Sequence, residues 1–588
     1  MCKNSGPAAS NELTLLDAIL KQRQTERPVS LRDDEAFEVF AAEQALLGKD
    51  LSPDEIAEGI VGSGNDGGID AIYVFAGDAL IADDSDVIGA DFQPTNTPRG
   101  IQLELWLVQA KRETSFSESA IEKLSDSAAR LLKIDSLESD LLELYSPSVV
   151  TRTGYFRKAL QALAIRHPKV AIRFVYATRG RKVDINNKVA IKANNLEHRL
   201  ANIVPGGEGS VEFLDATDLY RRVSTIPSYT SQLTYLESST SERSHIALVR
   251  LRDYIKFLRN DDDSLKRHIF DWNVRDYQGD VEVNKEIKSS LRDPGGPDFW
   301  WLNNGITVVC SKASVISKTY TLDSVQIVNG LQTSHAIFKE LSEVDSDHPA
   351  LDRSVLVRIL VTGDDRETRD RVIRATNRQT AVPAASLRAT DDIQRSIEDY
   401  FFLNSWYYDR RKGFHRNNNR SPERIVSIQL LAQAVMAMGL CRPDDSRARP
   451  SSLLKRDEDY LKVFSNDIPL SVYLWLARTQ KQIDAYLLSE RAGVTAQQRT
   501  NFRFHLSMLC ACDLVGRKIH NPRELVSVAN ADKIIEDGIL VYWLRFLLEA
   551  FSEFSLTSFD TDDKVAKGSD FVFFLLNRFE SNRHEKSS

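Results

Sequence analysis

Two short apolar runs near the N-terminus constrain the fold of this chain most strongly. Residues 69–75 (IDAIYVF) and 103–111 (LELWLVQAK) are of strand length and rich in branched and aromatic side chains. Residues 170–178 (VAIRFVYAT) and 211–214 (VEFL) have the same character. Because helical periods stand between these runs, we predict a first α/β domain that ends near residue 225.

The helices of this domain are indicated by apolar periods and capping residues. Residues 34–47 are predicted to form a helix with Asp33 or Asp34 as its N-cap, because Asp is a favoured capping residue. Helices are also expected after the second strand and over residues 155–164. Residues 77–100 are acidic, contain Gly and Pro and show no period, so we expect a loop or a hairpin insertion there.

A chain of 588 residues is too long for a single hydrophobic core. Short strands at residues 306–310, 324–328 and 355–361 alternate with helices in the middle of the chain, whereas helical periods dominate its end. We therefore predict an α/β chain of three domains: an α/β domain, an α+β domain and a helical domain. They are expected to cover residues 10–225, 226–465 and 466–588, respectively.

The composition favours a cytoplasmic protein without a membrane partner. No apolar stretch reaches the roughly 18–20 residues that span a bilayer, and residues 1–10 contain no apolar leader segment. The five cysteines are scattered without a CxxC pair, which fits a reducing compartment and offers no zinc site.

The net charge of −8 argues against a uniformly basic surface, as found in proteins that coat nucleic acid. The charge is segregated, because acidic residues crowd positions 78–91 and basic residues crowd positions 152–199 and 410–420. A local basic groove is therefore compatible with the composition. The chain contains neither a GxSxG motif nor a P-loop motif, so serine-hydrolase and P-loop chemistry have no matching elements.

The first two predicted strands carry the residue types that phosphodiester hydrolysis needs. Mg²⁺ or Mn²⁺ prefers oxygen ligands, which Asp70 on the first strand and Gln109 on the second can supply. Gln109 and Lys111 are two residues apart, so their side chains leave the same face of the strand. Lys111 is then placed to position water or to stabilise charge on the phosphate. Taken singly, each residue also fits a structural role, Asp70 beside a turn and Lys111 on a solvated face.

The helix predicted over residues 34–47 adds a third acid. Glu43 falls on the apolar stripe, and a carboxylate that points into a core needs a partner or a metal. Glu38 is the alternative on the same helix, with the small Ala42 as its neighbour. The predicted catalytic residues are therefore Asp70, Gln109, Lys111 and Glu43. The predicted metal ligands are Asp70, Gln109, Glu43 and the main-chain carbonyl of Ala110.

These segments resemble the PD-(D/E)XK, or restriction-endonuclease-like, fold in its Mrr-like version. The resemblance rests on GNDGGIDAIYVF at residues 64–75 and on the glutamine of LVQAK, 39 positions after Asp70. Mrr-like families show a GGID-type strand and a QxK in place of ExK. The resemblance covers roughly residues 10–225 and implies Mg²⁺- or Mn²⁺-dependent cleavage of DNA.

Polar segments in the middle of the chain offer candidates for nucleic-acid or nucleotide contact. Asn–Gly pairs form tight turns that expose main-chain N–H groups, and guanidinium groups match phosphates bidentately. Basic and aromatic residues interleave over residues 406–420, which suits nucleic acid, although a solvated basic loop is an equal alternative. The polar amides fit the capping of turns equally well. The predicted binding residues are Arg275, Asn304, Asn329, Gln332, Arg378, Arg410, Arg411 and Lys412.

Five separated segments match in order the AIPR family, which is named for abortive infection and phage resistance. They are NVRDYQG at 273–279, FWWLNNGIT at 299–307, VNGLQT at 328–333, ATNRQ at 375–379 and YYDRRKG at 407–413. The resemblance covers about residues 230–430, and an N-terminal Mrr-like nuclease is an arrangement seen in this family. It implies a role in bacterial antiviral defence, with phage or host DNA as the target.

The sequence leaves two classes of function open. The first is a DNA endonuclease effector whose central region senses a trigger, such as a nucleotide or a phage-derived molecule. The second is a nucleic-acid- or nucleotide-binding regulator whose nuclease fold is inactive or muted. For the endonuclease we expect DNA as the partner and a homodimer, because double-strand cleavage by a one-site subunit calls for two sites.

Overall fold

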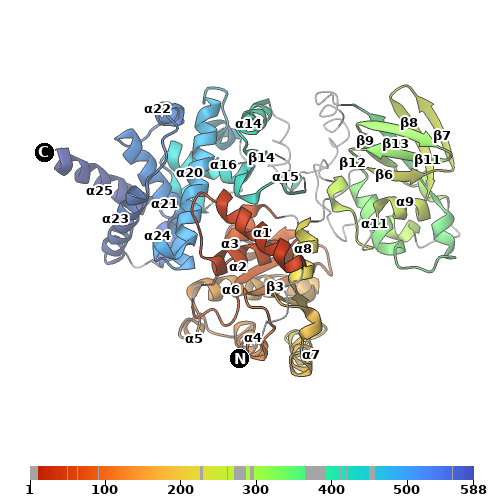
Figure 1. Ribbon diagram of the computed structural model, residues 1–588, viewed down its shortest axis with the longest axis horizontal. Helices are drawn as coiled ribbons and strands as arrows, with labels where there is room; N and C mark the ends of the chain where they lie inside the picture. The colour runs from red at the N-terminus through yellow and green to blue at the C-terminus, as the bar shows by residue number, and fades with distance from the viewer. Residues whose placement is uncertain are drawn as a thin grey trace, which may run out of the picture.

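The computed structural model describes residues 11–49, 51–62, 64–89, 92–224, 230–260, 263–270, 287–291, 297–363, 372, 392–410, 413–417, 420–448, 454, 457–558 and 560–587. The protein is a mixed α/β chain, as its sequence predicts. Figure 1 shows the N-terminal α/β domain against the C-terminal helices, with the central strands as a separate body. Within the described residues, no helix combines the length and the apolar character that a membrane span requires.

The N-terminal domain is built on a five-stranded sheet in the order β2-β1-β3-β4-β5. The strands are β1 (Ala71–Ala76), β2 (Ala79–Leu80), β3 (Gln102–Lys111), β4 (Lys169–Thr178) and β5 (Glu208–Leu214). β1 runs antiparallel to β2 and β3, whereas β3, β4 and β5 are parallel. The four strands predicted from the apolar runs are confirmed, and the acidic insertion, predicted as a loop or a hairpin, begins with a hairpin between β1 and β2.

Helices cover both faces of this sheet. On one face, Leu105 and Phe174 share a core with the helices that connect the parallel strands. These are α4 (Glu118–Leu131), α5 (Glu138–Leu142), α6 (Pro147–Ala162) and α7 (Asn187–Ala201). On the other face, Val108 and Val175 share a core with helices from the two ends of the domain. These are α1 (Asn11–Glu26), α2 (Asp33–Ala45), α3 (Pro53–Glu58) and α8 (Ala216–Ser224).

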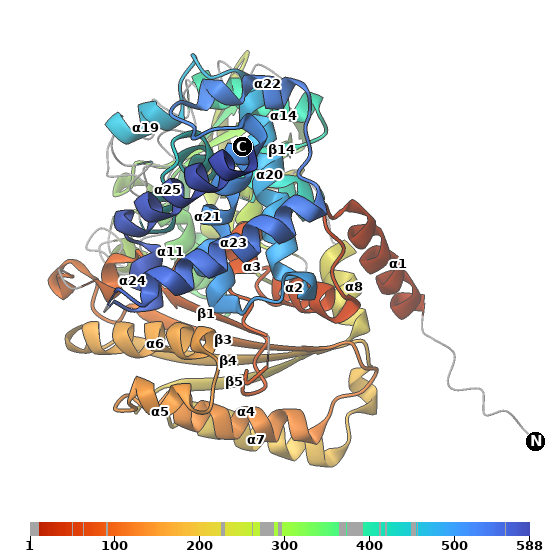
Figure 2. The ribbon, with the colours of Figure 1, turned by 90° about the vertical axis from the view of Figure 1, so that its left-hand side faces the viewer.

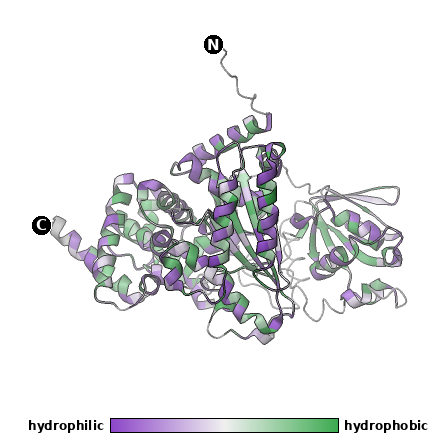
Figure 3. Cartoon of the chain, turned by 90° about the horizontal axis from the view of Figure 1, so that it is seen from below, coloured by the Kyte–Doolittle hydropathy of each residue, from purple (hydrophilic) through white to green (hydrophobic). Residues whose placement is uncertain are grey.

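Figure 2 shows the sheet with α4 and α7 on one side and α2, α3 and α8 on the other. The N-cap of α2 is Arg32, so the predicted capping role of Asp33 or Asp34 is wrong. Both acids lie in the first turn of the helix, where negative charge favours the exposed N–H groups of the helix dipole. Figure 3 shows hydrophobic residues along the strands and hydrophilic residues on the outer faces of the covering helices.

The central part contains two sheets around one core. A five-stranded sheet has the order β12-β9-β13-β8-β7, and a three-stranded sheet has the order β10-β11-β6. Their strands are β6 (Ser231–Thr234), β7 (Glu237–Ser241), β8 (Ser244–Arg250), β9 (Ile306–Cys310), β10 (Lys312–Ile316), β11 (Thr319–Asp323), β12 (Gln326–Asn329) and β13 (Ser354–Val361). The core also includes Tyr254 of α9 (Leu251–Leu258) and Ile337 of α11 (Leu331–Leu341). The three strands predicted in this part correspond to β9, β12 and β13.

Helices dominate from residue 392 onward, and we refer to residues 392–587 as the helical unit. It contains α14 (Asp392–Leu403), β14 (Tyr407–Asp409), α15 (Phe414–Asn417), β15 (Ile425–Ser427), α16 (Ile428–Ala434), a π-helix (Val435–Gly439), α17 (Pro443–Ala448), α19 (Asp457–Val463), α20 (Leu470–Leu488), α21 (Ala496–Val515), α22 (Val526–Asn530), α23 (Asp537–Ser555), α24 (Asp562–Ala566) and α25 (Ser569–Ser587). Tyr408, Met438 and Leu547 belong to the same core. The predicted boundary near residue 465 therefore lies inside one hydrophobic cluster.

Candidate active site

Asp70 lies immediately before β1, beside the C-terminal end of β3. Its main-chain N–H donates to the carbonyl of Val108 at 2.8 Å, and its Oδ2 accepts from the N–H of Ala110 at 2.8 Å. The antiparallel register pairs Ala71 with Val108, which brings Asp70 beside Gln109. The Asp70 carboxylate is 3% exposed, so the two strands fix it at a buried position.

Lys111 extends from the end of β3 towards this carboxylate. Its Nζ lies 3.9 Å from Asp70 Oδ2, and its side chain is 41% exposed. Although burial alone lowers the pKa of Lys111, the carboxylates of Asp70, Glu38 and Asp66 raise it above its ordinary value. Lys111 is thus a charged ammonium group that reaches from solvent into the acidic site.

Glu38 of α2 is the second carboxylate at this position. A Cβ atom added to Gly62 would lie 3.0 Å from Glu38 Oε2 and 3.6 Å from Asp70 Oδ1, so both carboxylates converge on this glycine. Burial and the nearby charge of Asp70 raise the pKa of Glu38 to about 8. Burial likewise raises the pKa of Asp70 to about 6, against the opposing effect of Lys111. Two adjacent carboxylates with raised pKa values form a site that a cation would stabilise.

The structure does not bring Glu43 into this cluster. Glu43 is buried, as the sequence predicts, but its carboxylate forms an ion pair with Arg23 of α1. Glu38 and Glu43 are five residues apart, which places them about 140° apart around a helix. The helix-borne acid beside Asp70 is therefore Glu38, the alternative in the sequence prediction, and Glu43 has a cationic partner elsewhere.

Gln109 supplies a buried oxygen without a hydrogen-bond partner. Its side chain is 2% exposed, and no described residue donates to its Oε1. A Cβ atom added to Gly68 would lie 3.4 Å from Gln109 Nε2, and Gly68 has a φ of +84° that favours glycine. The glycine therefore lets the loop approach the amide closely. A buried acceptor without a donor is costly unless a cation or water meets it.

These oxygens fit a hard divalent cation better than zinc. Among the described residues, no group of three or more His, Cys, Asp or Glu side chains is arranged to hold a metal. A metal here would rely on Glu38 and Asp70, the amide oxygen of Gln109 and main-chain oxygen or water. Such an all-oxygen set suits Mg²⁺ or Mn²⁺. Ala110 contacts Asp70 through its N–H, and its carbonyl remains a predicted ligand.

A second lysine lies at the rim of the site and was not predicted. Lys123 of α4 places its Nζ 3.0 Å from Asp66 Oδ1, which also accepts from the N–H of Gly68 at 2.6 Å. Its methylene groups lie beside Gly68, on the same side as Gln109. The side chain is 58% exposed, so its ammonium group remains accessible. The sequence gives little indication of this role, because most exposed lysines on helices are simply solvated surface residues.

The predicted binding residues of the central part have separate surroundings. Asn329 and Gln332 flank the turn at Gly330 between β12 and α11, whereas Asn304 is exposed before β9. The carbonyl of Asn304 accepts from Arg358 at 3.1 Å.

Arg410 is 4% exposed and is held by Glu398 at 3.0 Å, so it does not present its charge to solvent. The other predicted binding residues, Arg275, Arg378, Arg411 and Lys412, lie outside the described residues.

Residues 270–547 match the family model for AIPR protein. The match supports an AIPR family protein, and this family suggests a role in abortive-infection defence against phage. The matched region extends past the predicted boundary at residue 465 into the helical unit, and it leaves the N-terminal α/β domain outside. No curated protein and no solved structure matches the chain.

Proposed function

We propose that the N-terminal domain is a metal-dependent endodeoxyribonuclease and that the chain acts as an effector in abortive-infection defence. The observation that carries this proposal is the convergence of Glu38 and Asp70 on Gly62, beside the partnerless Gln109 Oε1 and the Lys111 ammonium group. Two carboxylates, a neutral oxygen ligand and a lysine are the parts that phosphodiester hydrolysis requires. The AIPR match supports the defence setting.

Glu38, Asp70 and Gln109 would hold Mg²⁺ or Mn²⁺. When bound, the cation supplies Lewis-acid polarisation of the scissile phosphate and lowers the pKa of water. Asp70 is fixed for this role because Ala110 N–H holds one carboxylate oxygen. The two carboxylates together balance a divalent charge, whereas the neutral amide of Gln109 contributes an oxygen without adding charge.

Lys111 and Lys123 would bind phosphates, and Lys111 would also orient the attacking water. Lys111 reaches the site from its solvent side, where its ammonium group can orient the attacking water and stabilise charge that develops on the phosphate. Lys123 lies farther out on α4, held by Asp66, and can contact a neighbouring phosphate of the DNA backbone. Neither lysine has to move a proton for these roles.

A plasmid-cleavage assay tests the proposal. Purified full-length protein should cut supercoiled DNA in Mg²⁺ or Mn²⁺ and should not cut it in EDTA. Asp70→Asn and Lys111→Met should each lower the rate by about 10²–10³-fold or more, because each removes a charge from the reacting centre. The exposed Asp78→Asn and Lys158→Met variants are matched controls in the same domain and should cut normally. A cleavage rate of Asp70→Asn equal to that of the wild-type protein would refute the proposal.

The second candidate is a regulator that binds nucleic acid or a nucleotide without turnover. The observation that favours it is Gln109 itself, because a neutral amide holds a metal less firmly than the carboxylate of an ExK strand. Binding of duplex DNA with no cleavage in either divalent ion would select this alternative. Cleavage that depends on Asp70 would exclude it.

We also propose that the endonuclease works as a homodimer, with DNA as its partner and a nucleotide or phage-derived molecule as its trigger. Two copies of the site would allow both strands to be cut. In the presence of DNA, light scattering should then give the mass of the DNA plus twice the chain mass of 66.4 kDa. A monomer both with and without DNA would contradict the dimer.

A further inference from the structure

The segment from α3 to Gly62 forms one wall of the candidate active site. The N–H groups of Val61 and Gly62 donate to the carbonyl of Asp70 at 2.8 and 3.2 Å. Ile60 forms an isolated bridge with Ala71, the first residue of β1. Any shift of this segment therefore moves Asp70 and the glycine on which the two carboxylates converge.

α3 is too short to hold this wall by itself. The helix has six residues, Pro53–Glu58, and helices of this length gain little stability from their own hydrogen bonds. Its first turn is closed by the Ser52 capping box, and its last turn leads directly into Gly59 and Ile60. The end that faces the active site must be held by contacts from other elements.

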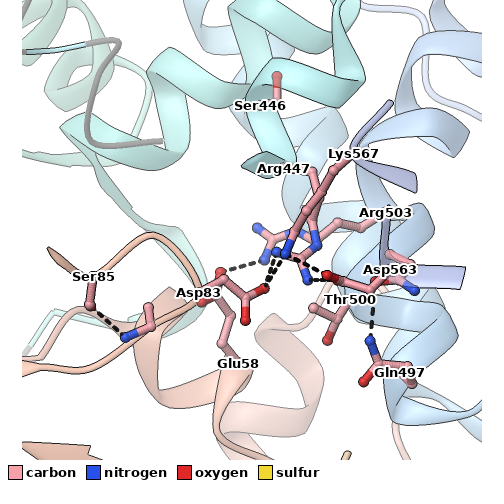
Figure 4. Close-up of polar contacts among 12 residues, drawn as sticks. Glu58, Asp83, Ser85, Ser446, Arg447, Gln497, Thr500, Arg503, Asp563 and Lys567 are labelled. Carbon is pink, nitrogen blue, oxygen red and sulfur yellow. Dashed lines mark hydrogen bonds and ion pairs between the residues drawn. The ribbon is translucent and has the colours of Figure 1, made fainter. Parts of the chain in front are cut away.

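Part of the support comes from the N-terminal domain, where Arg152 of α6 donates to the carbonyl of Glu58 and the N–H of Ile72 donates to the carbonyl of Gly59 at 3.0 Å. The other contacts come from the helical unit. Arg503 of α21 donates to Glu58 Oε1 at 2.8 Å, and Arg499 of the same helix donates to the carbonyl of Ile60 at 2.6 Å. At the other end of α3, Lys481 of α20 pairs with Asp54 at 2.7 Å. Figure 4 shows Arg503 from the helical unit beside Glu58 of α3.

The two arginines differ in their partners. Arg503 is only 9% exposed and also pairs with Asp484, so its charge is balanced by two carboxylates. Arg499 has a main-chain oxygen as its partner, and burial together with the charges of Arg152 and Arg503 lowers its pKa to about 10. Arg499 and Arg503 line one pocket with Glu58. An arginine buried against a carbonyl is suited to holding that carbonyl in place.

We infer that Arg499 and Arg503 are positioning residues of the candidate active site, and that they act through the segment from Glu58 to Gly62. The inference rests on the proposed function of the N-terminal domain. It implies that α21 helps to hold the metal site in place. This helix lies within the AIPR match and far from Asp70 in sequence. The helical unit is then a part of the nuclease rather than a separate module.

A second contact between the same two parts provides a matched control. Arg447 of α17 is 8% exposed and pairs with Asp83, which follows β2, and with Asp563 of α24 at 3.0 Å. Lys567 joins this group at 3.5 Å from Asp83. Figure 4 shows this group beside the pair of Arg503 and Glu58. Arg447 therefore joins the helical unit to the N-terminal domain through Asp83. Its charge also acts on the carboxylate of Glu58, but among the described residues it forms no hydrogen bond or ion pair with the segment from Glu58 to Gly62.

The test compares Arg499→Gln, Arg499→Lys and Arg447→Gln in the full chain. Mn²⁺ affinity is measured by calorimetry without DNA, and kcat and KM are measured with plasmid. Arg499→Gln should weaken Mn²⁺ binding and lower kcat by about 10-fold or more, with KM for DNA within about twofold. Arg499→Lys should recover most of the loss, because its ammonium group can still donate to Ile60. Arg447→Gln should leave Mn²⁺ affinity and kcat within about twofold, although it lowers the melting temperature.

The outcomes separate this inference from the proposed function. If Arg499→Gln and Arg447→Gln change Mn²⁺ affinity equally at the same folded fraction, Arg499 only joins the helical unit to the N-terminal domain, as Arg447 does. That result would overturn the inference. Unchanged Mn²⁺ affinity in Arg499→Gln overturns it as well. A wild-type protein that binds Mn²⁺ but never cuts DNA would refute the proposed function, while the Mn²⁺ titrations would still decide the role of Arg499. Glu58→Gln, which removes the carboxylate that Arg503 holds, provides a second variant with the same expected loss of Mn²⁺ affinity should Arg499→Gln fail to fold.

Discussion

The raised pKa of Glu38 predicts that this side chain destabilises the metal-free protein at alkaline pH. Folding raises the pKa from 4.5 to about 8, so the unfolded chain ionises Glu38 first as the pH rises. The contribution of Glu38 to the free energy of unfolding therefore falls as the pH rises from about 4.5 to about 8. Above that range this contribution stays constant. Replacing Glu38 by Gln removes this loss.

The size of the effect follows from the shift. A rise from 4.5 to about 8 corresponds to at most about 5 kcal/mol at high pH. Because the side chain is half-buried and keeps contact with water, we expect about 2 kcal/mol. In EDTA at pH 8.5, Glu38→Gln should therefore melt about 4–8 °C higher than the wild-type protein. At pH 5 the two proteins should melt within about 1 °C of each other.

Thermal unfolding followed by circular dichroism measures this difference. Asp34→Asn, an exposed carboxylate on the first turn of α2, is the control and should show no pH-dependent gain. Adding Mg²⁺ at about 100 times its dissociation constant should stabilise the wild-type protein by about 2.7 kcal/mol and Glu38→Gln by much less. A difference between wild type and Glu38→Gln that is the same at pH 5 and pH 8.5 would refute the reasoning.

Three further substitutions test the geometry of the site. Gln109→Glu adds a carboxylate where the buried amide oxygen lacks a partner, so calorimetry should show Mg²⁺ binding about 10-fold tighter. Unchanged Mg²⁺ affinity would argue against ligation of the metal by this residue. Gly62→Ala places a methyl group 3.0 Å from Glu38 Oε2 and should weaken Mn²⁺ binding about 10-fold, whereas wild-type affinity would show that the carboxylates do not meet there. Lys123→Ala should raise KM without changing kcat, and it should reduce by about one the slope of the logarithm of the DNA-binding constant against the logarithm of the salt concentration. The exposed Lys133→Ala variant is its control. A slope equal to that of the wild-type protein would show that Lys123 does not contact DNA.

The strands and one half of the site could be predicted because they depend on local patterns. Apolar runs indicated β1, β3, β4 and β5, and strand alternation placed Gln109 and Lys111 on one face. β1 and β3 pair antiparallel, so Asp70, just before β1, lies beside Gln109 near the end of β3. These features need no information from distant parts of the chain.

The helix-borne acid was harder to predict because α2 is buried on most of its surface. Residues from Ala36 to Ala45 are buried nearly all round, since α2 packs on the sheet and against α1 and α8. An apolar stripe therefore does not indicate which face meets Asp70. Arg23, the partner of Glu43, comes from another helix, and its position follows only from the tertiary packing.

Long-range contacts of charged side chains account for the remaining differences between the sequence predictions and the structure. Arg410 belongs to a basic run that suggests a solvated loop, yet it is buried against Glu398 of α14. Arg499 contacts Ile60 across a sequence separation of 439 residues, which no local pattern can indicate. Contacts of this kind place the helical unit against the wall of the candidate active site.

The cleavage rate of Glu38→Gln compared with that of Glu43→Gln tests the central claim most directly. Both variants replace a glutamate of α2 by its neutral isostere, and only Glu38 lies beside Asp70. In Mn²⁺, with folding confirmed by circular dichroism, Glu38→Gln should cut plasmid at least about 10²-fold more slowly than wild type. Glu43→Gln should cut within about threefold of wild type, although it melts earlier because Arg23 loses its partner. Normal cutting by Glu38→Gln, or loss of cutting by a folded Glu43→Gln alone, would contradict this site.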